Sequence, residues 1–234
     1  MPVTFTRHGA VRGALDILPL TVGSFLFGMA FGLLSVEAGL SALEASLMSG
    51  LVFAGASQFA AMQIWADPVP VATLILTTFA INARHLVMGA VLEPWLRPIG
   101  RLRALGSLFF MVDESWGLSV AKMRRGGTDA AYLAGGGATL YVIWAAGTIA
   151  GRLSGGLIPD PAAFALDFLP LALFLALLMT FWRGPGSLVP WLTSAAVAYA
   201  ADAVAGPGWP VLLGAIAGAL AGAVTDSRRG TAPS

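Results

Sequence analysis

The 234-residue chain is 57% hydrophobic and only 11% charged, whereas ordinary soluble domains have about 25% charged residues. This composition predicts an all-α, polytopic integral membrane protein. The net charge of +1 comes without an extended basic face, so we expect no nucleic-acid partner. The lack of cysteine excludes disulfides, thiolate metal sites and cysteine nucleophiles. We expect no catalytic residue, metal or cofactor.

Apolar runs long enough for membrane helices begin near residue 17. Residues 1–16 are polar and are expected to form a cytoplasmic segment, followed by a first span of about 20 residues. We assign residues 17–225 to a single transmembrane domain with about seven to eight membrane segments. Residues 226–234 are expected to form a cytoplasmic tail.

The second segment, Glu44 to Trp65, has small and polar residues at its centre, in the sequence FAGASQF at residues 53–59. In one interpretation these residues only form a close-packing face, through small residues at helical spacing: Gly50, Ala54, Ser57 and Ala61. In the other, the helix breaks near Gly55 and frees backbone amides that can bind an anion. Gln58 favours the second interpretation, because a side-chain amide needs hydrogen-bond partners in hydrocarbon.

The third segment, Thr73 to Gly89, places Asn82, Arg84 and His85 inside an apolar run. A basic side chain near the middle of a membrane helix costs about 2.5 to 3.5 kcal/mol on insertion scales, so such residues usually face a bundle interior and have a function. Helical spacing puts Asn82 and His85 on one stripe, with Arg84 about a quarter-turn away. We expect this segment to form one wall of a polar site.

The fourth segment, Leu105 to Val120, is apolar on both sides of the adjacent carboxylates Asp113 and Glu114. In one interpretation the segment is not a span, and the two carboxylates lie in an exposed loop. Otherwise they are expected to pair with Arg84, bind a cationic group or carry a proton.

Four further apolar segments follow, at residues 132–151, 164–181, 187–204 and 211–224. The sequence DILPL at residues 16–20 is echoed by DFLPL at residues 167–171. In a count of eight spans the two copies begin on opposite faces, which is typical of an inverted repeat with a binding site near the midplane.

The basic loops bear on the topology. If all eight segments cross, the arginines of residues 97–103 and the basic residues at 122–125 fall on opposite faces, which conflicts with the positive-inside rule. If the second and fourth segments are instead re-entrant, both loops become cytoplasmic. These two segments are also the ones with polar centres, so we hold re-entrance as a hypothesis.

Three motifs, FAGASQFAA (residues 53–61), INARHLVMG (81–89) and MVDESW (111–116), resemble those of the AzlC family of branched-chain amino acid exporters. The resemblance covers most of the chain. It implies a multi-pass protein of the bacterial inner membrane that exports valine, leucine, isoleucine or related amino acids, with a small AzlD-type membrane subunit as partner. The family's usual aromatic residue after the Arg-His pair is replaced by Met88, so the side-chain preference can differ.

Three polar interruptions lie at similar depth in consecutive segments, so we expect a secondary transporter that works by alternating access. An amino acid substrate needs an anion site, a cation site and an apolar pocket. The residues expected to bind the substrate are Gly55, Ser57, Gln58, Asn82, Asp113 and Glu114. Ser57 and Gln58, with nearby amides, are assigned to the carboxylate, and Asp113 or Glu114 to the ammonium group. The apolar pocket is assigned to Phe53, Phe59 and Met88.

Proton coupling or ion pairing is assigned to Arg84, His85, Asp113 and Glu114. His85 is a candidate proton carrier because imidazole titrates near physiological pH, and a structural hydrogen bond is the alternative. Two other classes of function stay open. Ser57 and His85 formally supply the nucleophile and base of an intramembrane serine hydrolase, and a passive channel would show flux without saturation or counterflow.

Overall fold

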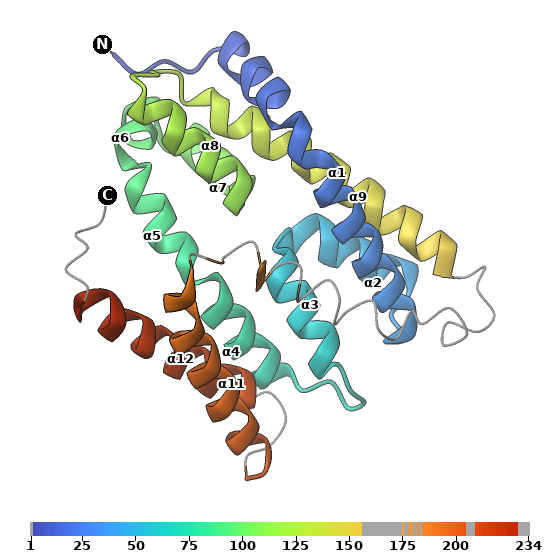
Figure 1. The fold of residues 1–234 in the computed structure, drawn as a ribbon. Coiled ribbons are helices and arrows are strands. Elements are labelled where there is room, and N and C mark those ends of the chain that lie inside the picture. The colour runs from blue at the N-terminus through green and yellow to red at the C-terminus, as the bar shows by residue number, and fades with distance from the viewer. Residues whose placement is uncertain are drawn as a thin grey trace. The chain divides into compact units, whose positions relative to one another are not determined.

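A computed structural model describes residues 2–155, 175, 178–179, 182, 184–204 and 209–228. All regular elements in this part of the chain are helices, which confirms the predicted all-α class (Figure 1). The chain forms two compact units, one made of Met1–Met62 and Asn82–Asp167, the other of Gln63–Ile81 and Phe168–Ser234. The second copy of the DILPL-like sequence, at residues 167–171, lies outside the described residues.

The first unit is built on two long helices, α1 (Arg7–Glu37) and α9 (Ala131–Gly155). Glycines line their contact: an added Cβ at Gly28 would lie 2.5 Å from the carbonyl oxygen of Trp144. Residue numbers increase in the same direction along the two helices: Gly13 faces Tyr132, Gly28 faces Trp144 and Gly32 faces Thr148. The helices are therefore parallel, and small residues allow their backbones to approach closely.

α1 begins earlier than the predicted first span. The Thr6 side chain caps the helix by accepting a hydrogen bond from the Gly9 amide (3.1 Å). The Thr6 amide and hydroxyl both donate to the carboxylate of Asp129, just before α9. These contacts make the polar stretch from Arg7 onward helical, and they fix the start of α1 beside the start of α9.

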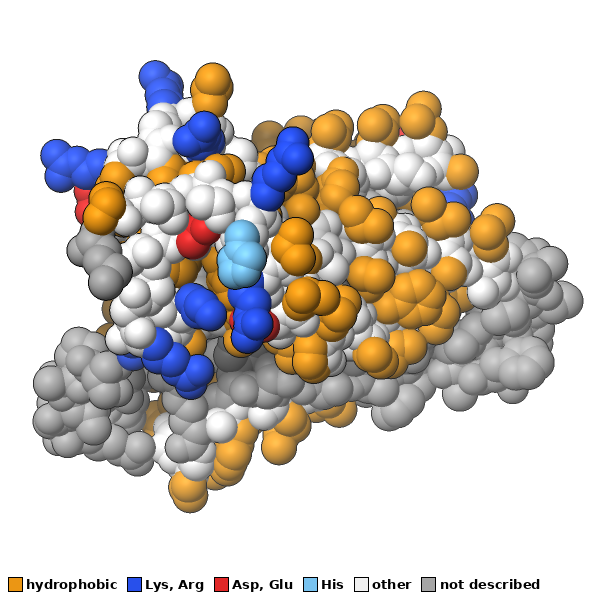
Figure 2. All heavy atoms as spheres, turned by 90° about the horizontal axis from the view of Figure 1, so that it is seen from above, with side chains coloured by type: hydrophobic (Ala, Val, Ile, Leu, Met, Phe, Trp, Pro, Cys, Tyr) orange, Lys and Arg blue, Asp and Glu red, His pale blue; other side chains and the backbone are white. Residues whose placement is uncertain are grey.

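Both basic loops, residues 97–103 and 122–125, lie at this same end of the first unit, which we call the basic end. The guanidinium of Arg103 lies 5.4 Å from the centre of the Phe5 ring, and the Trp95 indole donates to the Gly127 carbonyl (3.0 Å). The Thr4 amide donates to the carbonyl of Thr128 (2.8 Å). On the face shown in Figure 2, Lys and Arg side chains gather in one part, while hydrophobic side chains cover much of the rest.

The fourth predicted segment is a helix, a break and a second helix. α7 (Arg101–Phe109) leads away from the basic end, and α8 (Asp113–Arg124) leads back to it. The short stretch 110–112 between them is not helical. Because both ends of this segment lie at one end of the unit, its geometry is that of the re-entrant alternative.

The second predicted segment is broken in the same way. It consists of α2 (Ala42–Leu47), a π-helical turn η1 (Met48–Val52) and α3 (Gly55–Ile64), with Phe53 in the left-handed region (φ 41°) between them. The predicted break near Gly55 is therefore confirmed.

α3 runs back toward the end of the unit at which α1 finishes. The ring of Phe59 contacts that of Phe31 in the second half of α1, with centroids 6.4 Å apart. α2 begins only a few residues after α1 ends, so the second segment also starts and returns at one end. The two re-entrant segments thus enter the unit from opposite ends.

The two breaks meet at the middle of α9. The ring of Tyr141 lies 5.1 Å from that of Phe53, and 6.0 and 5.4 Å from those of Phe109 and Phe110. The Tyr141 hydroxyl also donates to the carbonyl of Gly50 (3.0 Å). One side chain of the central pair thus supports both re-entrant tips.

The third predicted segment is helical but interrupted at one residue. α4 (Val71–Asn82) and α5 (Arg84–Val91) are separated by Ala83. The Leu86 amide donates to the Ala83 carbonyl three residues back (3.1 Å), whereas a regular α-helix would use the carbonyl of Asn82. The stretch Val71–Val91 as a whole is, with α1 and α9, one of three helices in the described part long and apolar enough to cross a membrane.

α5 leads through two short helices, α6 (Glu93–Leu96) and η2 (Arg97–Ile99), to the basic end of the first unit. The second unit contains α11 (Leu188–Asp202) and α12 (Trp209–Arg228), which correspond to the last two predicted segments. A short turn, η5 (Pro185–Ser187), precedes α11.

Candidate functional site

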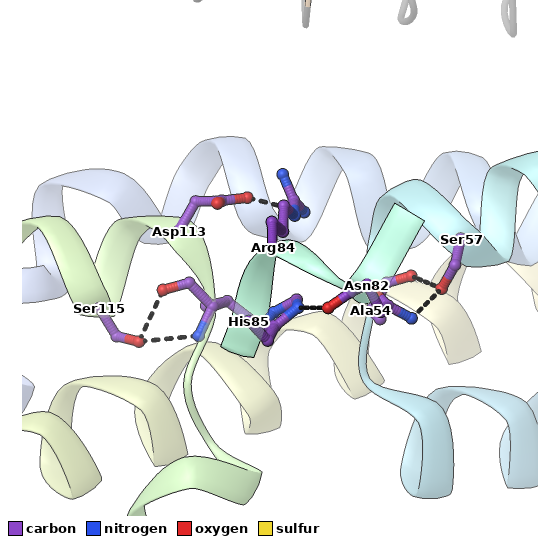
Figure 3. A network of polar contacts seen from close by, with 8 residues as sticks. Ala54, Ser57, Asn82, Arg84, His85, Asp113 and Ser115 are labelled. Carbon is purple, nitrogen blue, oxygen red and sulfur yellow. Dashed lines mark hydrogen bonds and ion pairs between the residues drawn. The ribbon is translucent and has the colours of Figure 1, made fainter. Parts of the chain in front are cut away.

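The polar residues of the second and third segments meet at the α4/α5 break (Figure 3). Ser57, which is 2% exposed, lies in the first turn of α3, and its hydroxyl donates to the Ala54 carbonyl (2.9 Å). The Asn82 amide nitrogen donates to the Ser57 oxygen (3.1 Å). One re-entrant tip is thereby hydrogen-bonded to the interrupted helix.

The other re-entrant tip is joined to the same break by an ion pair. Arg84 Nη2 lies 2.9 Å from Asp113 Oδ2, and these side chains are 36% and 42% exposed. The Ser115 hydroxyl accepts a hydrogen bond from the Val112 amide (3.0 Å), which caps α8 and sets Asp113 at its first turn. Of the roles expected for the two carboxylates, the structure shows Asp113 in an ion pair with Arg84.

Glu114 points elsewhere, because neighbouring residues on a helix project about 100° apart. Its side chain is exposed, and it forms no ion pair within the described part of the chain. The two adjacent carboxylates are therefore not equivalent: Asp113 forms the ion pair with Arg84, and Glu114 does not take part in it.

His85 makes a local contact. Its Nδ1 lies 3.1 Å from the backbone carbonyl of Asn82, and it must carry the hydrogen there because a carbonyl only accepts. This bond uses the carbonyl freed by the interruption at Ala83. It corresponds to the structural alternative for His85, although within the same segment rather than between helices.

The geometry does not favour the hydrolase hypothesis. A serine nucleophile needs its hydroxyl directed at the base, but the Ser57 hydroxyl donates to Ala54 and accepts from Asn82. No hydrogen bond between Ser57 and His85 is present among the contacts of the described residues.

Gln58 lies in the interior rather than at the site surface, with 0% exposure. Its side-chain oxygen accepts from the Ala54 amide (3.2 Å), and its nitrogen donates to Ser49 (3.4 Å). Both ends of the amide are therefore used to hold the break itself. The predicted role of Gln58 as a carboxylate ligand is not supported by this position.

The sequence did not single out the residues that complete this buried network. Ser49 Oγ lies 2.8 Å from Thr148 Oγ1 and also accepts from the Trp144 indole (3.3 Å). Gly55 packs against the same indole, where an added Cβ would lie 2.8 Å from the Trp144 ring. Ser and Thr are common in membrane helices, so their types and spacing gave no specific signal.

The residues assigned to an apolar pocket are buried in the unit. Phe53 packs on Tyr141, and Phe59 packs edge-on against Trp144 with centroids 6.3 Å apart. Met88 belongs to the hydrophobic cluster at the basic end. Their exposures of 6%, 4% and 7% are those of core residues, and they pack against different neighbours rather than lining one shared pocket.

Two polar atoms at the break are buried and have no hydrogen-bond partner among the described residues: Asn82 Oδ1 and Arg84 Nε. Buried polar groups nearly always have partners, so each such atom requires an explanation. The described residues contain no group of three or more His, Asp or Glu that could hold a metal ion.

Comparison with known proteins gives the family. The model of the AzlC protein family matches residues 19–158. The chain belongs to the AzlC family. It is 30% identical over 186 residues to inner membrane protein YgaZ of Escherichia coli, covering 76% of this chain and 75% of that protein.

Other relatives are similar over comparable lengths. The branched-chain amino acid transport protein AzlC of Bacillus subtilis is 26% identical over 166 residues, covering 70% of this chain and 65% of that protein. An uncharacterized membrane protein of Archaeoglobus fulgidus is 31% identical over 175 residues, with 74% and 76% covered. No solved structure matches the chain.

The family match includes both re-entrant segments and the α4/α5 break, so every polar contact of the site lies in the family-matched region. Membership and the named relatives identify this chain as an integral membrane protein and support function as a membrane transporter.

Proposed function

We propose that this AzlC-family protein exports branched-chain or similar hydrophobic amino acids across the bacterial inner membrane by proton-coupled alternating access. One observation carries the proposal: two re-entrant tips from opposite ends of the first unit are bonded to residues 82 and 84, on either side of the interruption in one helix. Interrupted helices with polar tips are the usual construction of binding sites in secondary transporters. The substrate class rests on the name of the Bacillus subtilis relative.

The two contacts at the break suit alternating access. The Ser57–Asn82 hydrogen bond holds the tip between α2 and α3, and the Arg84–Asp113 ion pair holds the tip between α7 and α8. Because the tips enter from opposite ends, loosening one contact opens the site toward one end only. Two gates around one site are what alternating access requires.

Proton coupling is assigned to the carboxylates at the start of α8. Protonation of Asp113 removes the charge that attracts Arg84, so the ion pair weakens and the tip between α7 and α8 is released. Glu114, at the next position of α8, is the second carboxylate to which we assign proton exchange. His85 then serves to hold the Asn82 carbonyl.

The proposal also includes a partner. The family resemblance implies a small AzlD-type membrane subunit, and the exposed apolar side chains of α4 and α5, such as Phe79 and Leu86, leave surface for lipid or for such a subunit. Co-purification of the two chains from a bacterial membrane fraction tests this part separately.

Counterflow of labelled leucine, valine and methionine in proteoliposomes tests the function. We expect saturable exchange by the wild-type protein, alone or with its partner, and loss of exchange in Asn82→Ala. Flux without saturation or counterflow would instead indicate a passive channel. Labelling by a fluorophosphonate probe that disappears in Ser57→Ala would indicate a hydrolase.

A further inference from the structure

We propose that Asn82 and Arg84 hold the two charged ends of a zwitterionic α-amino acid, with Asn82 Oδ1 accepting from its ammonium group and Arg84 Nε donating to its carboxylate. This inference rests on the proposed function and specifies its binding groups. The sequence analysis assigned the substrate carboxylate to Ser57 and Gln58 and the ammonium group to Asp113 or Glu114, so this inference changes both assignments.

The orientation of the Asn82 amide is set by its neighbour. The Ser57 hydroxyl donates its hydrogen to the Ala54 carbonyl (2.9 Å), so the Ser57 oxygen can only accept from Asn82. The nitrogen of Asn82 must therefore face Ser57, at 3.1 Å, and Oδ1 must face away. Oδ1 is buried and has no donor in the described structure.

Arg84 presents the complementary atom. Its Nη2 lies 2.9 Å from Asp113, while its Nε is buried and has no acceptor in the part of the chain described. The N–H groups of Nε and Nη2 point along one edge of the planar guanidinium, which matches carboxylate oxygens. Half of this edge is used by Asp113, and the other half remains for a second acceptor.

A zwitterion supplies both missing partners at once. An unpaired acceptor on Asn82 requires a donor, and an unpaired donor on Arg84 requires an acceptor. An α-amino acid carries an ammonium group and a carboxylate on one carbon atom, and residues 82 and 84 flank a single residue of the break. The zwitterion adds no net charge to the Arg84–Asp113 pair, so the occupied site stays neutral overall.

The predicted carboxylate ligands are less suitable. Ser57 already donates and accepts, and Gln58 is fully buried with both ends of its amide bonded. Ordered water could instead satisfy the two unpaired atoms. In that case neither atom would distinguish one ligand from another, and the test below separates these possibilities.

The test measures binding of labelled leucine to the full chain in lipid nanodiscs, with two competitors that each lack one charged end. Leucinamide has no carboxylate, and 4-methylpentanoate has no ammonium group. We expect the wild-type protein to prefer leucine over each analogue by at least about tenfold, since one charge-assisted contact is lost in each case.

Arg84→Gln is expected to remove the preference for leucine over leucinamide, with Arg84→Lys as a second variant that keeps the charge but lacks Nε. The matched control is Asp113→Asn, which breaks the same ion pair but leaves Nε in place. This control should still discriminate against leucinamide.

Asn82→Leu is expected to remove the discrimination against 4-methylpentanoate, and Asn82→Asp, which keeps an acceptor oxygen, should retain it. The control is Ser57→Ala, which removes the same hydrogen bond but leaves Asn82 Oδ1.

Wild-type binding of leucine with unchanged competitor ratios in Arg84→Gln, Arg84→Lys and Asn82→Leu would overturn the inference and leave the proposed function intact. The two atoms would then be satisfied by water. If the wild-type protein binds neither leucine nor any other α-amino acid, the proposed function fails and the inference fails with it.

Discussion

The two re-entrant segments have the same plan but are held in different ways. Each is a helix, a break and a second helix, and each tip contacts Tyr141 and the α4/α5 break. The tip between α2 and α3 is fixed by buried, uncharged hydrogen bonds, with Ser57 and Gln58 almost fully enclosed. The tip between α7 and α8 is held to the break by the half-exposed Arg84–Asp113 ion pair.

This difference predicts which tip moves more easily. Leaving a buried polar group without its partner costs about 1 to 3 kcal/mol, whereas an exposed ion pair contributes about 0 to 1 kcal/mol. The tip between α7 and α8 is therefore expected to be the easier one to release. The tip between α2 and α3 is the more rigid part of the site.

The largest expected effect is all-or-none and tests whether the two segments enter from opposite sides. The chain has no cysteine, so Ala42→Cys, Arg101→Cys and Arg125→Cys each introduce a single thiol. In intact cells and inverted vesicles, we expect a membrane-impermeant maleimide to label positions 101 and 125 from one side and position 42 from the other. Labelling of 101 and 125 from different sides would mean that the segment from α7 to α8 crosses the membrane.

The next effect concerns the rigidity of the tip between α2 and α3. Gln58→Leu leaves the Ala54 amide and the Ser49 network without their partners, so we expect a loss of about 2 to 4 kcal/mol in the free energy of unfolding. Tryptophan fluorescence during unfolding in mild detergent measures it. Glu114→Gln, on an exposed side chain, is the control and should change stability by less than about 0.5 kcal/mol. Equal stability of the two variants would contradict the comparison.

A smaller effect is expected at the ion pair. In leucine counterflow, Arg84→Gln and Asp113→Asn should each reduce exchange, and the double variant should lose less than the sum of the two. We expect a coupling of about 0.5 to 1 kcal/mol from this cycle, because the pair is half-exposed. Arg97→Gln is the control, because the Arg97–Glu93 pair is longer (3.6 Å) and more exposed. Strict additivity of the two losses would show that the pair does not act as a unit.

The smallest effect is expected at His85. Its hydrogen bond to the Asn82 carbonyl is local, so His85→Gln should reduce exchange only modestly, by a net loss of about 0.5 to 1.5 kcal/mol, and leave its pH profile unchanged. Asp113→Asn in the same assay should flatten that profile. A profile that moves in His85→Gln but not in Asp113→Asn would assign the proton to the imidazole.

Much of the site could be predicted from sequence because its chemistry is local. Asn82, Arg84 and Asp113 are conspicuous in an apolar chain, and the structure brings them together. The direction of Gln58 could not be predicted, because a side-chain amide near a break can turn toward a ligand or toward the core. That choice depends on Ser49 and on Thr148, which lies about one hundred positions further along the chain.

The sequence by itself determined the membrane class, the all-α class and the break near Gly55. Hydropathy and the placement of glycine and polar residues act within one or two helical turns, so they can be read from neighbouring letters. Only the tertiary structure decided that α1 and α9 run parallel, that both basic loops lie at one end, and which carboxylate meets Arg84. These features depend on packing between residues far apart in the chain, and hydrophobic segments of similar composition do not specify their neighbours.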